Sequence, residues 1–199
     1  MNHPLRTLTV AHPNSVIDAT VKVGNNVAIE PGVIIGKNSS ISHNSRIGQG
    51  SRIGANVHIG AGCKIGARSI INHNCIIQPA VTVQAGVVMG LQCFVGSRCV
   101  IKSGVVMGSN IQLWGSNVIH EQTFIDDAQF IGEYVSLNPA SVYRSVQGKH
   151  DSMMIFQGRA HTKFAKSVTI AQALVNQVAV NGVDAALFTS ILEAEFAAD

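Results

Sequence analysis

Three histidines at turn positions have the right chemistry for a general base. His43 lies in the stretch ISHNSRIG, His73 in IINHNCII and His120 in NVIHEQT. Histidine is the side chain most often used for proton transfer, because its unperturbed pKa of about 6.5 lies close to neutral pH. His, Asn and Ser are also ordinary turn residues, since they bond to nearby backbone. Each stretch is therefore consistent with either a base or a plain turn.

The histidines belong to a six-residue repeat that runs from Ser15 to Val146 without an insertion. Residues 15–146 divide into 22 blocks of six, such as VIIGKN, SRIGAN and VHIGAG. The third residue of each block is Ile, Val, Leu or Met, except Tyr143 in the last block. The first residue is small or β-branched almost everywhere, and Gly takes the fourth place in ten blocks.

The repeat predicts short strands separated by turns. Apolar or small residues at the first and third places flank a variable residue, which is the period of a strand with one face inside. The other three residues are rich in Gly, Asn, Ser, Gln and Pro, which turn the chain. The apolar spacing of a helix is absent. Because one block cannot bury its own apolar face, the blocks must stack on one another.

This pattern resembles the hexapeptide-repeat proteins, which fold as a left-handed parallel β-helix. The resemblance covers about two thirds of the chain and implies an all-β solenoid of about seven triangular coils, each of 18 residues. Inward residues 18 apart are then expected to stack, which places Cys75 next to Cys93. The predicted organisation is an N-terminal lead-in or cap at residues 1–14, the left-handed β-helix at 15–146, and a loop with a C-terminal helix at 147–199.

Two further features of the sequence suggest contacts beyond the repeat itself. Residues Val183 to Ala198 have the pattern of an amphipathic helix, which we expect to pack on the prism or on a partner subunit. Trp114 lies at a turn position, where an exposed indole is unusual. It either packs against the C-terminal segment or a neighbouring subunit, or it forms a wall of a ligand cleft.

The family resemblance also implies an activity. Most hexapeptide-repeat proteins that resemble this chain are acyltransferases that use coenzyme A or acyl carrier protein. They are usually homotrimers with active sites in the clefts between prisms. We therefore expect a homotrimer, an acyl-CoA such as acetyl-CoA as co-substrate, and a sugar or other small polar molecule as acceptor. In this family a turn histidine is the general base, and backbone N–H groups steady the oxyanion.

The sequence favours His73 as the base, with His120 and His43 as alternatives. At most one is expected to act, because the 18-residue coil places the three on different faces. A similar stretch occurs in sialic acid O-acetyltransferases and related N-acetyltransferases, although Asn74 replaces their acidic residue after the histidine. His73 also leaves about four coils on its C-terminal side, where the family binds coenzyme A. His43 resembles the His-Asn turn of the glucosamine N-acyltransferase of lipid A synthesis. His120 has the hexad phase of the base in UDP-N-acetylglucosamine acyltransferases, and Glu121 follows it.

Basic residues near these turns are candidates for binding the phosphates of coenzyme A. Lys102 lies 18 residues before His120, so it is expected to stack beside it, and Arg98 is close in sequence. Arg159 and Lys163 lie in QGRAHTK, which occupies the place of a Gly-x-Pro-Ala-Lys segment that closes the cleft in many acyltransferases. Such residues more often form a solvated surface.

Several other functions are disfavoured. The net charge of +3 is too small to indicate nucleic-acid binding, and no apolar run is long enough to span a bilayer. The zinc-binding carbonic anhydrases of the same fold need histidines 5 and 36 residues apart, and no pair has either spacing, so no metal is expected. The four cysteines lie at core positions, which predicts reduced thiols. The N-terminal stretch lacks the pattern of a signal peptide, so we expect a cytoplasmic location.

The alternative is a non-catalytic scaffold. The repeat lacks the long excursion loop that many acyltransferases use as a cleft wall, and a terminal helix is predicted. Catalytically silent β-helix proteins of carboxysome-like shells resemble this arrangement and recruit partners through a terminal helix. The residues before the predicted helix are not a Gly/Pro/Ser linker, which makes this the second hypothesis.

Overall fold

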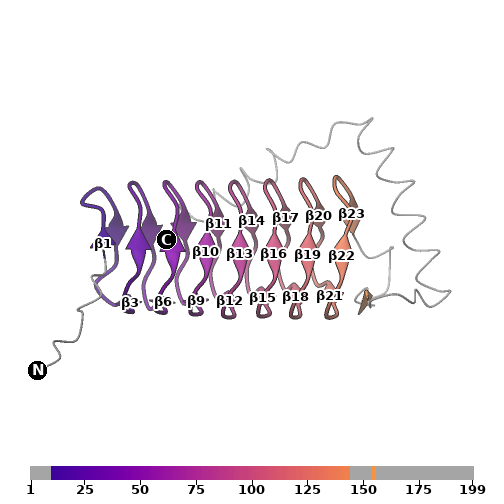
Figure 1. Ribbon diagram of the computed structural model, residues 1–199, viewed down its shortest axis with the longest axis horizontal. Helices are drawn as coiled ribbons and strands as arrows, with labels where there is room; N and C mark the ends of the chain where they lie inside the picture. Colours follow the sequence, from indigo (N-terminus) through magenta and orange to yellow (C-terminus); the bar gives the residue numbers. More distant parts are fainter. Residues whose placement is uncertain (1–9, 144–153, 156–199) are drawn as a thin grey trace, which may run out of the picture.

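The computed structural model describes residues 10–143 and 154–155, which form a parallel β-solenoid of about seven coils. These residues contain 24 strands of two residues each, arranged in three sheets of eight strands. The strands of each sheet succeed one another along the long axis of the molecule (Figure 1). The predicted all-β solenoid is therefore confirmed.

Successive strands belong to different sheets, which we name sheet A, sheet B and sheet C. Sheet A contains β1 (Val10–Ala11), β4 (Ala28–Ile29), β7 (Arg46–Ile47), β10 (Lys64–Ile65), β13 (Thr82–Val83), β16 (Val100–Ile101), β19 (Val118–Ile119) and β22 (Ser136–Leu137). Sheet B contains β2 (Val16–Ile17), β5 (Ile34–Ile35), β8 (Arg52–Ile53), β11 (Ile70–Ile71), β14 (Val88–Met89), β17 (Val106–Met107), β20 (Phe124–Ile125) and β23 (Val142–Tyr143). Sheet C contains β3 (Lys22–Val23), β6 (Ser40–Ile41), β9 (His58–Ile59), β12 (Ile76–Ile77), β15 (Phe94–Val95), β18 (Gln112–Leu113), β21 (Phe130–Ile131) and β24 (Met154–Ile155).

The register of the sheets follows the repeat. Ile53 pairs with Ile71 and Met89 with Met107, each 18 residues further along the chain. One step among the described strands differs, because Phe130 of β21 pairs with Met154 of β24. The 18-residue coil therefore holds from β1 to β23.

The third residues of the hexads fill the core. Ile53, Ile71 and Met89 have no exposed surface, and one continuous apolar cluster runs through the coils. Removing an Ile or Met side chain from water contributes roughly 1.5–3 kcal/mol to folding. Because no block can bury this residue alone, the stacking of coils supplies the stability.

The first residues of the hexads bind one coil to the next. The Ser39 hydroxyl donates to the carbonyl oxygen of Gly54 at 2.8 Å, and the Cys75 thiol donates to that of Gly90 at 3.1 Å. The Asn117 amide does the same for Gly132 at 2.7 Å. In each case the acceptor lies 15 residues ahead, at the fourth place of a hexad. Where this place holds Ser, Cys, Thr or Asn, the side chain can therefore add a hydrogen bond between coils, whereas Val at the same place contributes only packing.

Two turn positions carry strict steric requirements. The sixth residue of every hexad from Asn26 to Ala140 has a positive φ, between 49° and 70°. Asn and Gly tolerate this left-handed conformation best, which explains their frequency there. The fourth residue approaches the next coil closely, since a Cβ on Gly66 would lie 2.4 Å from the carbonyl carbon of Gln84.

Some sequence expectations lie wholly or partly outside the described residues. The predicted helix at 183–198 and residues 1–9 of the lead-in are not among them, and of the predicted loop that precedes the helix only residues 154–155 are described, as strand β24. Strand β1 lies before the first predicted hexad and pairs with β4. Within the described part of the chain, no helix has the length and hydropathy that a membrane span requires.

Replacing Gly66 by Ala should destabilise the solenoid more than replacing Gly62 by Ala. The Gly66 Cβ would clash with the backbone of the next coil, at a cost of about 3 kcal/mol. A Cβ on Gly62 meets nothing within 4 Å, so the only cost of Gly62→Ala is the backbone strain of a φ of +68°, about 1 kcal/mol. Urea unfolding of the two variants measures the difference. Equal losses would contradict the close approach of the coils.

Candidate functional site

The three candidate histidines lie at three different corners of the prism. The A–B corner joins each strand of sheet A to the next strand of sheet B, and the B–C and C–A corners are defined in the same way. His120 follows β19 at the A–B corner, His73 follows β11 at the B–C corner, and His43 follows β6 at the C–A corner. The structure does not bring the three together, as the 18-residue coil predicted.

His73 is engaged in a contact between coils. Its Nδ1 accepts a hydrogen bond from the backbone N–H of Ala55 at 2.8 Å. Two later coils have the same kind of bond at this corner. Ser109 Oγ accepts a hydrogen bond from the Leu91 N–H, and Asp127 Oδ1 accepts one from the Ser109 N–H. His73 therefore fills a structural role that other residue types fill elsewhere on this corner.

The bond to Ala55 also fixes the tautomer of His73. A backbone N–H can only donate, so Nδ1 must remain unprotonated and the neutral ring carries its proton on Nε2. In this state Nε2 is a donor and does not accept a proton. This geometry does not favour His73 as a general base.

His43 lies on the surface of the C–A corner. Its backbone carbonyl accepts from the N–H of Gly62 at 3.0 Å, whereas none of the described residues hydrogen-bonds to its ring. Nothing in the described part of the chain orients the imidazole. His43 therefore has the position of a turn residue, without the partner that a positioned base needs.

His120 lies in a cluster of charged side chains at the A–B corner. Its Nδ1 is 3.2 Å from Lys102 Nζ and 3.7 Å from Glu121 Oε2. Lys102 Nζ is also 3.3 Å from Glu121 Oε1. The His120 and Lys102 side chains are about seven-tenths buried, with 29% and 28% of their surface exposed. This cluster has the composition and partial burial of an acid–base site.

The Glu121 carboxylate makes His120 different from His73. The backbone N–H of Glu121, and to a smaller extent the Lys102 ammonium, hold the pKa of the Glu121 carboxyl below its usual range. The carboxyl therefore remains ionised at neutral pH. An acceptor therefore lies beside His120 Nδ1, together with the donor Lys102. In the observed arrangement the Lys102 ammonium donates to Nδ1, which leaves the proton of the neutral ring on Nε2, as in His73. His120 differs because it has a second partner: when Lys102 pairs with the carboxylate instead, Glu121 Oε2 stabilises a proton on Nδ1 and Nε2 can accept a proton.

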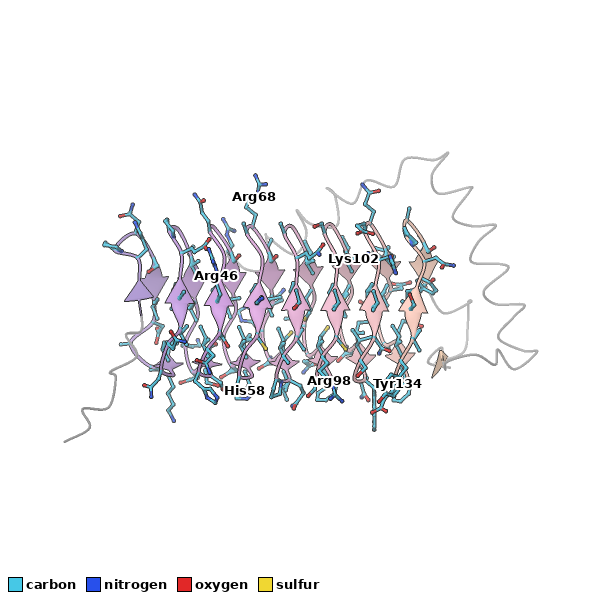
Figure 2. The ribbon with its side chains drawn as sticks, in the orientation of Figure 1. Arg46, His58, Arg68, Arg98, Lys102 and Tyr134 are labelled. Carbon is cyan, nitrogen blue, oxygen red and sulfur yellow. The ribbon has the colours of Figure 1, made fainter. Side chains whose placement is uncertain are left out.

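The predicted phosphate-binding residues are separated in the structure. Lys102 lies beside His120, as the 18-residue spacing predicted, and it shares its charge with Glu121. Arg98 lies at the C–A corner, at the other edge of sheet A, and Figure 2 shows it away from Lys102. Arg159 and Lys163 lie outside the described residues.

A pocket of about 220 Å³ lies at the C–A corner of the later coils. Its lining includes Phe94, Arg98, Trp114, Ser116, Glu133 and Tyr134. Trp114 therefore forms a pocket wall, which is one of the two roles that the sequence left open. The sequence analysis missed Glu133 and Tyr134. For Tyr134 the sequence did contain a signal, which is a bulky residue at the sixth place of the hexad, where the repeat prefers Asn or Gly.

The four cysteines do not have the environment of nucleophiles. All are free and buried. Burial raises the pKa of the Cys63 thiol, and it raises that of Cys99 to about 11. The neighbouring Cys75 thiol, together with burial, raises the pKa of Cys93. The Cys63, Cys93 and Cys99 thiols are therefore protonated at neutral pH and donate to carbonyls of the next coil, and the buried Cys75 thiol donates to Gly90 in the same way.

The described residues also lack a cluster that could ligate a metal. No three His, Cys, Asp or Glu side chains within 10–143 and 154–155 come together in a way that could hold an ion.

Comparison with known families now adds to this geometry. Residues 28–61 match the family described as bacterial transferase hexapeptide (six repeats). The match covers one part of the six-residue repeat, which continues on both sides of it in the coils described above. No curated protein sequence matches the chain.

Several solved structures are similar in fold. A mutant of GDP-perosamine N-acetyl transferase from Caulobacter crescentus, in complex with CoA and GDP-perosamine, is 21% identical over 69% of this chain, with a TM-score of 0.34. The matched part is 53% of that protein, so this chain spans about half its length. LpxA from Acinetobacter baumannii is 19% identical over 67% of this chain and 68% of its own, with a TM-score of 0.41. The UDP-N-acetylglucosamine acyltransferase from Campylobacter jejuni is 16% identical over 67% and 70%, with a TM-score of 0.33.

The raised pKa of Cys99 predicts a loss of stability at high pH. An unfolded thiol has a pKa of about 8.5, and the folded value is about 11. The folded state holds the proton more tightly, so this stabilisation is complete below pH 8.5 or so and is lost as the pH rises through 11 or so. Replacing Cys99 by Ser removes the effect and keeps a donor, as at Ser39.

Urea unfolding of both proteins across this range provides the measurement. Between pH 8 and pH 11, the wild type should lose roughly 2 kcal/mol more than Cys99→Ser. Parallel pH profiles for the two proteins would show that the buried thiol is not responsible.

Proposed function

We propose that this protein is an acyltransferase that transfers an acyl group from acyl-CoA to a hydroxyl or amine of a small polar acceptor, with His120 as the general base. The observation that carries the proposal is the cluster at the A–B corner, where His120 Nδ1 faces both Glu121 and Lys102. The hexapeptide repeat supports the reaction class, because most proteins that resemble it catalyse acyl transfer.

The reaction needs one base and one positioned thioester. His120 Nε2 takes the proton of the acceptor hydroxyl or amine as that atom bonds to the thioester carbonyl carbon. The carbon–sulfur bond then breaks, and the proton passes from His120 to the departing thiolate, which leaves as coenzyme A. Atoms and charge balance without a metal or a covalent enzyme intermediate.

Glu121 and Lys102 act on His120 and not on the substrate. When Lys102 pairs with Glu121 and releases Nδ1, the carboxylate favours a proton on Nδ1, so Nε2 presents its lone pair, and it also stabilises the imidazolium that forms. Lys102 holds the carboxylate through the 3.3 Å ion pair and limits its rotation. Both are positioning residues, whereas His120 contacts the reacting atoms.

The assembly is part of the proposal. We infer a homotrimer in which the A–B corner of one prism faces a neighbouring prism, because a single convex corner cannot enclose two substrates. Acetyl-CoA is the first donor to test. Sedimentation or light scattering of the purified chain decides the oligomeric state.

Substitution of His120 tests the base. His120→Ala should lower kcat by about 10²–10⁴-fold with acetyl-CoA and a responsive acceptor, because proton transfer in the transition state is lost. Glu121→Gln should lower kcat about tenfold and change the pH profile, since the amide cannot stabilise the imidazolium in the same way. Initial rates of coenzyme A release measure both effects.

Ser in place of His73 provides the matched control. Ser109 already fills the equivalent position on the same corner, so His73→Ser keeps an acceptor for the Ala55 N–H. This variant should retain activity within about twofold. Loss of activity in His73→Ser with activity retained in His120→Ala would reverse the assignment of the base.

The scaffold hypothesis gives the opposite result in a simpler assay. Acetyl-CoA and longer acyl-CoA should raise the melting temperature of the protein and be turned over in the presence of an acceptor panel. If neither occurs, the enzyme proposal fails. A pull-down with residues 183–199 as bait then tests the scaffold.

A further inference from the structure

We propose that the pocket at the C–A corner binds a neutral sugar ring stacked on Trp114. The pocket lies at a different corner from His120, and the inference does not rest on the proposed acyl transfer. Its lining combines exposed aromatic rings with both signs of charge, and the packing of the coils does not require such residues.

The indole of Trp114 has no side chain above or below it in its own column of the corner. Trp114 takes the fourth place of its hexad, and the residues 18 before and 18 after it are Gly96 and Gly132. These glycines present no side chain, so the indole has no stacked neighbour in its own column. It keeps 46% of its surface exposed and rests on the Phe130 ring, at a centroid distance of 5.8 Å.

The backbone holds Trp114 in place. Its carbonyl oxygen accepts hydrogen bonds from the Cys99 thiol at 2.9 Å and from the Asn117 amide at 2.8 Å. Its N–H donates to the Ile131 carbonyl at 2.9 Å. An exposed ring on a fixed backbone is a preorganised binding surface, because binding orders little that is not already ordered.

Two residues beside the indole occupy unfavourable backbone positions. Arg98 and Tyr134 have φ values of 61° and 58°, at the sixth place of their hexads. Earlier on the same corner this place holds Asn26 and Asn44, whose side chains bond to each other at 2.8 Å. This backbone conformation costs a bulky residue more free energy than it costs Asn or Gly. Strain of this kind is common at binding sites, and Figure 2 shows both residues along one edge of the prism.

The charges of the pocket favour a neutral ligand. Arg98 and Glu133 both line it, so its formal charge is zero and Glu133 opposes the binding of a phosphate. The hydroxyls of Ser97 and Ser116 and the amide of Gln78 offer further donors and acceptors. A pyranose matches this lining, because one face of the ring is apolar and its hydroxyls point outward.

The size of the pocket limits the ligand to about one ring. Its volume of about 220 Å³ is below the roughly 300–1,000 Å³ of sites for drug-sized molecules. Exposed Trp and Tyr rings supply apolar area at a small entropic cost. We therefore expect weak binding, with Kd in the millimolar range.

The fluorescence of Trp114 reports directly on this pocket, because the chain contains one tryptophan. We expect a saturable change in emission when the full-length protein is titrated with glucose, galactose or N-acetylglucosamine. Sorbitol is the control for added solute, since it has the hydroxyls of glucose without a ring. ADP and coenzyme A form the competing arm. A sugar should saturate the signal at a lower concentration than either nucleotide.

Variants that restore the residue preferred by the repeat separate binding from folding. Tyr134→Asn and Arg98→Asn should each weaken sugar binding about tenfold and raise the melting temperature, because Asn suits a positive φ. Arg68→Asn is the matched control. Arg68 has a φ of 55° at the same hexad place, but it lies at the A–B corner. This variant should raise the melting temperature and leave binding unchanged.

Three results would overturn the proposal. These are no saturable change with any sugar, an equal change with sorbitol, and tighter binding of ADP or coenzyme A. Unchanged sugar binding in both Tyr134→Asn and Arg98→Asn would also overturn it. Because none of these readouts depends on turnover, they remain informative if acyl transfer is not found.

Discussion

The close approach of successive coils constrains every other feature of this protein. Backbone N–H groups of one coil donate to carbonyls of the next, as Gly54 does to Ile71 at 2.8 Å. At the corners the backbones come so near that a single Cβ at Gly66 would overlap the next turn. The repeat satisfies this constraint with small or β-branched residues at the first place of most hexads, aliphatic residues at the third, and Gly or Asn at many turn positions.

This constraint also limits where chemistry can occur. The interior is filled with aliphatic side chains, so functional groups are confined to the outer strand positions and the corners. A large or charged residue at a corner replaces one that would suit the backbone better. Lys102, His120 and Trp114 take the place that Gly holds in ten hexads, and Arg98 and Tyr134 take the left-handed place. These departures gather at two corners, and both proposed sites lie there.

The distinction between His73 and His120 depends on what lies opposite Nδ1. His73 faces the Ala55 N–H, which can only donate, and this leaves the ring proton on Nε2. His120 faces Lys102 and the ionised Glu121, so either tautomer has a partner. The same type of residue therefore acts as a structural acceptor at one corner and is suited to proton transfer at another.

The sequence by itself determined the solenoid, its 18-residue coil and the stacking of Lys102 beside His120. A period that holds through 22 hexads leaves one way to bury the third residue of each, and residues 18 apart then become neighbours. It also placed the histidines at separate corners. Only the tertiary structure decided which of them has a suitable partner, because that depends on atoms one coil away and on the direction of each ring nitrogen. The pocket beside Trp114 likewise required the structure, since its lining comes from four coils, with Gln78 and Tyr134 far apart in the chain. Spacing can place residues in a column, but the space between columns depends on side-chain conformations that spacing does not define.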